Sequence, residues 1–226
     1  LFSKIFDNLN LGYKNTSFRY RSILNIKNSY FDYSKLTKKN STYSFQAINL
    51  YYAYTKKKPI FTYKSVLKKR VNKYIIKNQV HKFITIHLKH DPLNKLAHAN
   101  YKNWNKAFKK IKFEKNLFIF LVGNTNANKY FKGSIENLIL CKNDFSLPEE
   151  MYLVSISKYF IGMASGFCCA ANFSNVPYSI IKHPDHHKEL IKDELDDNKI
   201  PFSSKNQNIL FVKQSVSNIV KILNNI

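Results

Sequence analysis

The most informative part of the chain is the stretch Tyr159-Phe-Ile-Gly-Met-Ala-Ser-Gly-Phe-Cys-Cys-Ala-Ala-Asn-Phe-Ser-Asn-Val-Pro177. Its apolar beginning predicts a strand over Tyr159–Ile161 that ends at Gly162, and the small residues Ala164-Ser165-Gly166 predict a tight turn. A helix is expected directly afterwards, over Phe167–Asn172. Free N–H groups at such a turn suit the binding of an anion, for example a diphosphate.

The same alternation of short strands and helices extends over the chain from His81 onward. Continuous apolar runs of this kind are typical of strands buried on both faces of a sheet. The predicted strands are Phe83–Leu88, Leu117–Val122, Leu138–Leu140, Tyr159–Ile161, Tyr178–Ile181 and Ile209–Phe211, and the predicted helices between them are Trp104–Ile111, Pro148–Ser157, Phe167–Asn172, Pro184–Leu195 and Gln214–Leu223. The fold class is therefore α/β, with a Rossmann-like parallel sheet in a domain over residues 81–226.

A smaller, mostly helical, basic segment is expected to precede this domain, over residues 1–80. Residues 1–82 hold 18 basic and 2 acidic residues, a net charge of +16, whereas residues 83–226 hold 19 and 12. Helices are predicted over Ser44–Tyr54 and Tyr63–Lys77. In the second, Val66, Val71, Tyr74 and Ile75 fall near one face and the lysines elsewhere, which predicts an amphipathic helix.

The composition limits the class of protein. With 226 residues, 44% of them hydrophobic, the chain can bury a core, which excludes disorder and collagen-like repeats. The apolar run Leu117–Val122 is shorter than the ~20 residues of a membrane span. The three cysteines form neither a disulfide framework nor C-x-x-C, which favours a reducing, cytoplasmic setting. The chain opens at Leu1 without an initiator Met, so we expect a fragment.

The net charge of +23 has two explanations. A surface selected to bind polyanions is one. Of the 37 basic residues, 34 are lysines, and asparagine, isoleucine, phenylalanine and tyrosine are also abundant. AT-rich codons produce the same composition, so both explanations stay open.

Candidate site residues follow the predicted strands, because ligands of open parallel sheets bind beyond the carboxyl ends of the strands. After the first strand comes His87-Leu-Lys-His-Asp91, in which His87 and Lys89 share one side of an extended chain. The lysine can neutralise a phosphate, Asp91 can orient the lysine or accept sugar hydroxyls, and the imidazole can donate to an oxyanion. A polar strand end that enters a loop at Pro92 explains the same residues.

Other element ends carry further candidates. Gly123-Asn124 follows the second strand, where a residue without a side chain lets a ligand approach the backbone, although an ordinary turn explains it equally. Glu149 suits the positive end of the helix Pro148–Ser157, and a carboxylate there can also bind ribose hydroxyls. Ser165 and Gly166 form the anion-binding turn, or Ser165 merely caps the helix after it.

Several other chemistries lack their motif. Neither G-x-G-x-x-G nor G-x-x-x-x-G-K-[ST] occurs in the chain. Gly162-Met-Ala-Ser-Gly166 is one position out of register with the G-x-S-x-G nucleophile elbow of serine hydrolases. His183-Pro-Asp-His-His187 does not match H-E-x-x-H, so we predict no metal site.

The motifs form a combination found in one group of enzymes. A strand ends in His87-x-Lys89-x-Asp91, a later strand ends in Gly123, and Phe160-Ile-Gly-Met-Ala-Ser-Gly166 opens a small-residue helix that runs to Val176-Pro177. This combination resembles the carboxyl-terminal domain of GT-B glycosyltransferases, in particular heptosyltransferase-like and fucosyltransferase-like enzymes of bacterial surface polysaccharides, over residues 80–226. Lys89 stands where such families usually have arginine, so the bidentate fork is missing.

The resemblance implies transfer of a sugar from a nucleotide-sugar donor to a glycan or lipid-linked acceptor, without a metal or other cofactor. It implies donor-phosphate binding by His87, Lys89, Asp91, Ser165 and Gly166, and nucleotide binding by Gly123, Asn124, Glu149 and Gly162. The general base stays unassigned, because it normally comes from the amino-terminal domain, of which residues 1–80 are a part.

Two other kinds of function stay open. The charge and the interleaved aromatic residues of residues 1–82 suit a module that binds nucleic acid or another polyanion, with binding that falls steeply with salt. An inactive transferase remnant that serves as a scaffold is the second. The basic helix Tyr63–Lys77 would then contact the inner face of an anionic membrane peripherally.

Overall fold

The computed structural model describes residues 48–49, 52–53, 55–123, 128–131, 137–141, 144–186, 195 and 199–226. The chain divides into two compact units, Leu1–Thr62 with His187–Ser203, and Tyr63–His186 with Ser204–Ile226. Little of the first unit is described, and the predicted helix Ser44–Tyr54 lies mostly outside the described residues. The second unit contains the sheet and all of the candidate site residues that the structure describes.

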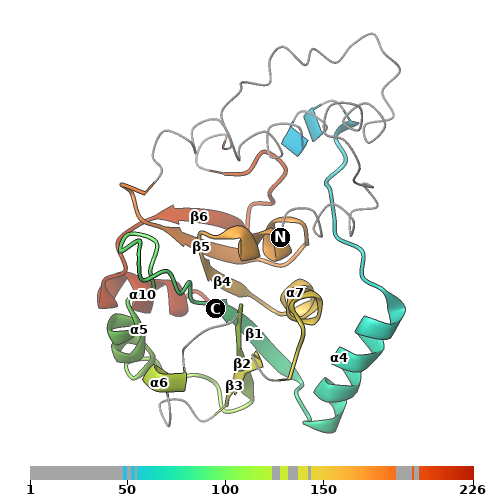
Figure 1. Ribbon diagram of the computed structural model, residues 1–226, viewed down its shortest axis with the longest axis horizontal. Helices are drawn as coiled ribbons and strands as arrows, with labels where there is room; N and C mark the ends of the chain where they lie inside the picture. Colours follow the sequence, from blue (N-terminus) through green and yellow to red (C-terminus); the bar gives the residue numbers. More distant parts are fainter. Residues whose placement is uncertain are drawn as a thin grey trace. The chain divides into compact units, whose positions relative to one another are not determined.

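Six parallel strands form one sheet in the described part of the second unit (Figure 1). They are β1 (Lys82–His87), β2 (Leu117–Val122), β3 (Leu138–Leu140), β4 (Phe160–Met163), β5 (Tyr178–Lys182) and β6 (Gln207–Phe211), in the order β3-β2-β1-β4-β5-β6. This is the Rossmann-like arrangement that the sequence predicts. All six predicted strands are present, and the largest differences are that β4 continues to Met163 and β6 begins at Gln207.

Helices cover both faces of the sheet (Figure 1). α5 (Tyr101–Phe108), α6 (Asn128–Phe131) and α10 (Val216–Leu223) lie on one face, where Trp104, Ile219 and Ile222 pack against Ile84 and Ile86 of β1. α4 (Ser65–Lys77), α7 (Leu147–Ile156) and α8 (Cys169–Asn172) lie on the other. This double cover explains why the strands are apolar on both faces.

The predicted helices Tyr63–Lys77, Pro148–Ser157 and Gln214–Leu223 are observed as α4, α7 and α10, with starts shifted by one or two residues. Two other predicted helices also begin elsewhere, and a side-chain cap marks each start. The predicted Trp104–Ile111 is observed as α5, because the Asn100 side chain accepts a hydrogen bond from the N–H of Asn103 and starts the helix there. The predicted Phe167–Asn172 begins with a 3-10 turn, η3 (Gly166–Cys168), before α8. Of the predicted Pro184–Leu195, Pro184 and Asp185 form a turn, and residues 187–194 lie outside the described residues.

α4, together with Tyr63 just before it, packs against α7 and Phe145 just before α7. The hydroxyl of Tyr63 donates to the carbonyl of Met151 at 3.1 Å, and the ring of Tyr74 meets that of Phe145 at 4.7 Å. Val71 is fully buried, as expected. The expectation that Val66 shares this face is wrong, because 70% of Val66 is exposed. No helix in the described ranges is both long and apolar enough to cross a membrane.

Candidate functional site

The candidate site lies where the strand order of the sheet reverses. The chain proceeds from β1 outward to β2 and β3, and then returns to place β4 on the other side of β1. Ligands of doubly wound sheets bind beyond the carboxyl ends of the strands at this reversal. His87, the last residue of β1, pairs with Val122 of β2 and with Gly162 of β4, so it stands at this position.

Two hydrogen bonds fix the tautomer of His87. Its Nδ1 lies 3.1 Å from the carbonyl oxygen of Val122, and its Nε2 lies 2.9 Å from the Oγ of Ser165. Since a carbonyl oxygen can only accept, Nδ1 carries the hydrogen. Nε2 of the neutral ring is then an acceptor, and the hydroxyl of Ser165 donates to it.

The ring of His87 is held in a buried environment, with 5% of the residue exposed. It stacks on the ring of Phe167, with centroids 4.8 Å apart. Burial lowers the pKa of His87 to about 4, the bond to Val122 opposes this shift, and the charge of Lys89 adds to it. His87 is therefore neutral near pH 7.

Ser165 connects β4 to the small-residue helix. Its Oγ accepts a hydrogen bond from the N–H of Phe167 at 3.3 Å while its hydroxyl hydrogen points to His87. Ser165 thus caps η3, as one of the two interpretations of the sequence has it, and also contacts His87. Binding of an anion at this turn stays a prediction. Gly166 is exposed, and its N–H has no acceptor within the described part of the chain.

Lys89 and Asp91 form an ion pair just beyond the end of β1. The Nζ of Lys89 lies 3.0 Å from Oδ2 of Asp91, and the two side chains are 26% and 30% exposed. The hydrogen bond from Lys89 lowers the pKa of Asp91. The charge of Lys89 also lowers the pKa of His87 and opposes the burial that raises the pKa of Cys168. Lys89 therefore acts electrostatically on the surroundings of Ser165.

Gly123 is required by the packing around His87. Its φ is +83°, and a Cβ at this position would lie 2.2 Å from Nδ1 of His87. Only glycine fits such a backbone without strain. The Gly123 N–H donates to Oε2 of Glu150 at 2.9 Å. Asn124, predicted beside it, lies outside the described residues.

Glu150 is a neighbour of the site that the sequence patterns did not single out. It is 4% exposed, and burial raises its pKa to about 7, with the bond from Gly123 opposing the shift. The capping pattern of Ser146 and Glu149 could have identified Glu150 from the sequence. Because Glu149 is the third residue of the helix and caps it, the next residue points about 100° away, toward the sheet.

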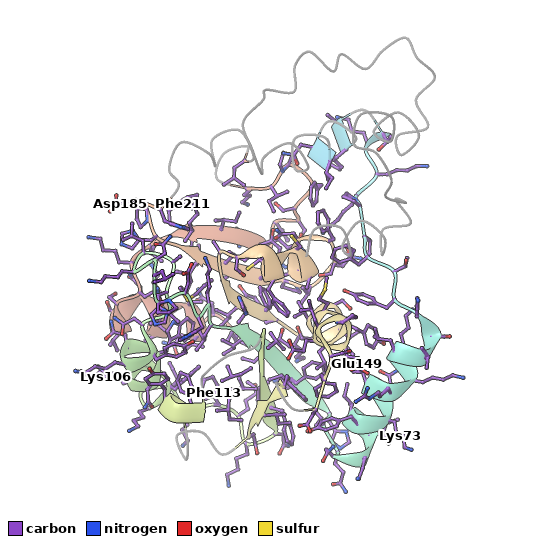
Figure 2. The ribbon with its side chains drawn as sticks, in the orientation of Figure 1. Lys73, Lys106, Phe113, Glu149, Asp185 and Phe211 are labelled. Atoms are coloured by element: carbon purple, nitrogen blue, oxygen red, sulfur yellow. The ribbon has the colours of Figure 1, made fainter. Side chains whose placement is uncertain are left out.

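The structure does not bring Glu149 to the strand ends. Its Oε2 accepts hydrogen bonds from the N–H and the hydroxyl of Ser146, at 2.7 and 2.6 Å. Its Oε1 lies 3.2 Å from Nε of Arg70 on α4. Figure 2 labels Glu149 on α7. This carboxylate is engaged in capping and in an ion pair between helices.

Gly162 is buried inside β4, and its neighbours require a residue without a side chain. A Cβ there would lie 2.5 Å from two atoms of the Phe160 ring and 3.2 Å from Sγ of Cys168. The nearby thiol of Cys168 donates to the carbonyl of Met163 at 3.0 Å, and burial raises its pKa to about 11. The Phe160 ring and the Cys168 thiol therefore fill the space that a side chain at position 162 would need, and Cys168 stays protonated.

The arrangement offers complementary groups for an anion at one sheet edge. Lys89 supplies a positive charge, Gly166 supplies an N–H without an acceptor among the described residues, and Ser165 supplies a hydroxyl group whose hydrogen is directed to His87. Across the ranges that the structure describes, no three His, Cys, Asp or Glu side chains gather where they could hold a metal ion. None of the three cysteines forms a disulfide, and all three are buried.

Comparisons with protein families and curated proteins identified no relative of this chain. No protein-family model matches the chain, and no curated protein matches it. The residues at the carboxyl ends of β1, β2 and β4 are therefore what points to a function.

Proposed function

We propose that the sheet unit binds the diphosphate of a nucleotide-sugar and serves as the donor half of a glycosyltransferase. The observation that carries this proposal is the hydrogen bond between Ser165 and His87 across the reversal of the strand order. It joins the end of β1 to the turn after β4, and the charge of Lys89 acts on both His87 and Cys168. These are residues that the resemblance to GT-B enzymes implies for the donor phosphates.

The chemistry of sugar transfer supports this assignment. When the bond between the sugar and the diphosphate breaks, negative charge develops on the leaving phosphate, and stabilising that charge is electrostatic work. Lys89 offsets part of the charge, and its pairing with Asp91 holds the ammonium group in place. Gly166 supplies a hydrogen-bond donor without a further charge, and Ser165 does so when its hydroxyl hydrogen turns from His87 to the phosphate. The acceptor, a glycan or a lipid-linked sugar, would be deprotonated by a base that we leave unassigned.

A thermal-shift screen of nucleoside diphosphates and their sugars tests the proposal. A ligand at 100 times its dissociation constant stabilises the fold by ~2.7 kcal/mol. We expect one nucleotide class to stabilise the protein, and the double variant Ser165→Ala with Lys89→Ala to lose the effect. Lys95→Ala is the matched control, since Lys95 is an exposed lysine of the same loop. Equal shifts in the double variant and the wild type would reject the proposal.

We also propose that α4 makes a peripheral contact with an anionic membrane at its inner face. Val66 and Ile76 are 70% and 76% exposed, and the exposed Lys69, Lys73 and Lys77 lie on the same side of the helix (Lys73 is labelled in Figure 2). Exposed apolar side chains among lysines favour a bilayer interface, because the lysines attract lipid headgroups and the apolar groups insert. Nucleic acid has no apolar layer into which the side chains of Val66 and Ile76 could insert.

Co-sedimentation with phosphatidylglycerol vesicles separates these partners. We expect binding to weaken in the double variant Val66→Asp with Ile76→Asp, and to stay unchanged in Leu93→Asp, which alters an apolar residue that is 99% exposed in the loop after β1. Equal binding by both variants would contradict the contact. Salt-sensitive RNA binding without vesicle binding would favour the nucleic-acid alternative.

A further inference from the structure

The hydroxyl hydrogen of Ser165 is committed to His87 in the absence of a ligand. Nδ1 of His87 donates to Val122, so Nε2 can only accept, and Ser165 is its donor. The Oγ of Ser165 also accepts from the N–H of Phe167. Toward solvent, Ser165 therefore offers a lone pair, whereas an anion requires a donor.

A ligand anion can change this arrangement in two ways. If the hydroxyl turns its hydrogen to the anion while His87 stays neutral, the buried Nε2 loses its donor, and an unsatisfied buried acceptor is destabilising. If His87 gains a proton, Nε2–H donates to Ser165, and Ser165 donates to the anion. Only the second arrangement gives every donor and acceptor a hydrogen-bond partner, from Val122 through His87 and Ser165 to the anion.

We infer that an anion binding at Ser165 takes up one proton from solvent, and that this proton resides on Nε2 of His87. One N–H bond forms at Nε2 as an O–H bond of hydronium breaks and releases water, and the Ser165 hydroxyl hydrogen turns from Nε2 to an anion oxygen. No other covalent bond forms or breaks. The inference rests on the anion-binding part of the proposed function. It makes His87 a positioning residue that turns Ser165 into a donor.

The charged and titratable groups around His87 come from several elements. Lys89 beyond β1 disfavours a charged His87, and Asp91 partly balances Lys89. Glu150 of α7 contacts His87's neighbour Gly123 and itself titrates near pH 7. Cys168 of η3 stays a neutral thiol. A dianion is the added charge that can hold the proton on His87, since it attracts the imidazolium in a site of low dielectric.

In the proposed sugar-transfer reaction, the proton on His87 would stabilise the leaving diphosphate. The departing diphosphate carries one more negative charge than the diphosphate within the donor. A protonated His87, acting through Ser165, strengthens binding most where that charge is greatest. The interaction is therefore larger late in the reaction than in the donor complex, which is the property that accelerates a chemical step.

Sulfate is a suitable probe, because it keeps its double charge across the pH range of interest. The full chain is titrated with sodium sulfate at several pH values between 5 and 8, and the imidazole ¹⁵N signals of His87 report its protonation. We expect His87 to be neutral without sulfate and charged when sulfate is bound. The affinity should fall by up to about tenfold per pH unit as pH rises.

Two variants separate His87 from its titrating neighbour. His87→Gln keeps a donor for Val122 and an acceptor for Ser165 but cannot take up the proton, so the pH dependence of sulfate affinity should disappear. Glu150→Gln removes the other group that titrates in this range, and the pH dependence should persist. The inference would be overturned if the pH dependence of sulfate affinity persisted in His87→Gln and disappeared in Glu150→Gln.

Other outcomes distinguish this inference from the proposed function. Nucleotide-sugar binding that depends on Ser165 and Lys89 while His87 stays neutral would retain the donor site and overturn the proton uptake. Sulfate binding with a charged His87, without binding of any nucleotide, would retain the proton uptake and reject the donor. His87 signals that sulfate leaves unchanged at every pH would overturn the inference.

Discussion

At the scale of single residues, the ring of His87 sets what its neighbours can be. Its Nδ1 lies 2.2 Å from the position that a Cβ of residue 123 would take, and its Nε2 lies 2.9 Å from the Oγ of Ser165. A histidine followed by polar residues at a strand end can be recognised from the sequence alone. That its ring contacts two other strand ends cannot, because the contacts join residues far apart in the chain.

Gly123→Ala should destabilise the fold, by more than about 2 kcal/mol, because alanine is strained at a φ of +83° and its Cβ collides with His87. Urea denaturation measures the change. Gly166→Ala is the control, since Gly166 lies outside the left-handed region and is exposed. A loss in Gly166→Ala as large as that in Gly123→Ala would contradict the explanation.

Glu150 should make stability fall as pH rises. Its pKa in the folded state is about 7 and its ordinary value is 4.5, so the folded state binds more protons between these values. The stabilising contribution is complete below pH 4.5 and is lost as pH rises through 7, by about 3 kcal/mol in all. His87, whose pKa is lowered to about 4, has the opposite effect over the acidic part of this range.

Glu150→Gln isolates the effect of the carboxyl group. We expect the free energy of unfolding of this variant to exceed that of the wild type increasingly from pH 5 to pH 8, and to show no such excess at pH 4. Denaturation curves at each pH provide the comparison. A difference between variant and wild type that is constant with pH would show that the carboxyl group does not titrate as described.

At the scale of secondary-structure elements, the strands were predictable and the helix starts were not. Continuous apolar runs identify a strand buried on both faces, whichever strand it pairs with. Helix starts depend on caps such as Asn100, whose side chain could equally face solvent, whereas Ser165 was recognisable as a cap beside its small-residue turn. Val66 shows the limit of periodicity, because lying near an apolar face does not guarantee a partner element to cover it.

The start of α7 gives a prediction at this scale. Glu149→Ala should cost about 1–2 kcal/mol, because the N–H and hydroxyl of Ser146 lose their acceptor. Glu149→Gln retains a capping oxygen and loses only the pair with Arg70, whose side chain is 67% exposed, so it should cost less than about 1 kcal/mol. Thermal denaturation ranks the two variants, and equal losses would assign the effect to the ion pair.

At the scale of the whole molecule, strand order brings the site together. β1 and β4 are neighbours although more than 70 residues separate His87 from its partner Gly162, and only the three-dimensional pairing shows this. The sequence indicated that the residues after the strands matter, which grouped His87, Gly123 and Ser165 as candidates. It did not indicate the tautomer of His87 or the role of Glu150, because both depend on which strand ends meet.

The net charge of +23 affects the stability of the whole folded state, and this effect must be distinguished from that of anion binding at the site. Like charges repel one another more in a compact chain than in an unfolded one, so salt should stabilise the fold by screening. Sodium chloride should therefore raise the melting temperature of the wild type and of the double variant Ser165→Ala with Lys89→Ala, and sulfate should raise it further in both by exclusion from the surface.

Anion binding at the site contributes only the stabilisation that exceeds these general effects of salt. At matched ionic strength, the extra stabilisation by sulfate over chloride should be larger in the wild type than in the double variant, and this excess should shrink as pH rises from 5 to 8 because bound sulfate requires a proton on His87. Thermal scans of both proteins in both salts measure it. An excess of zero at every pH would assign the response to sulfate to the charge of the whole molecule.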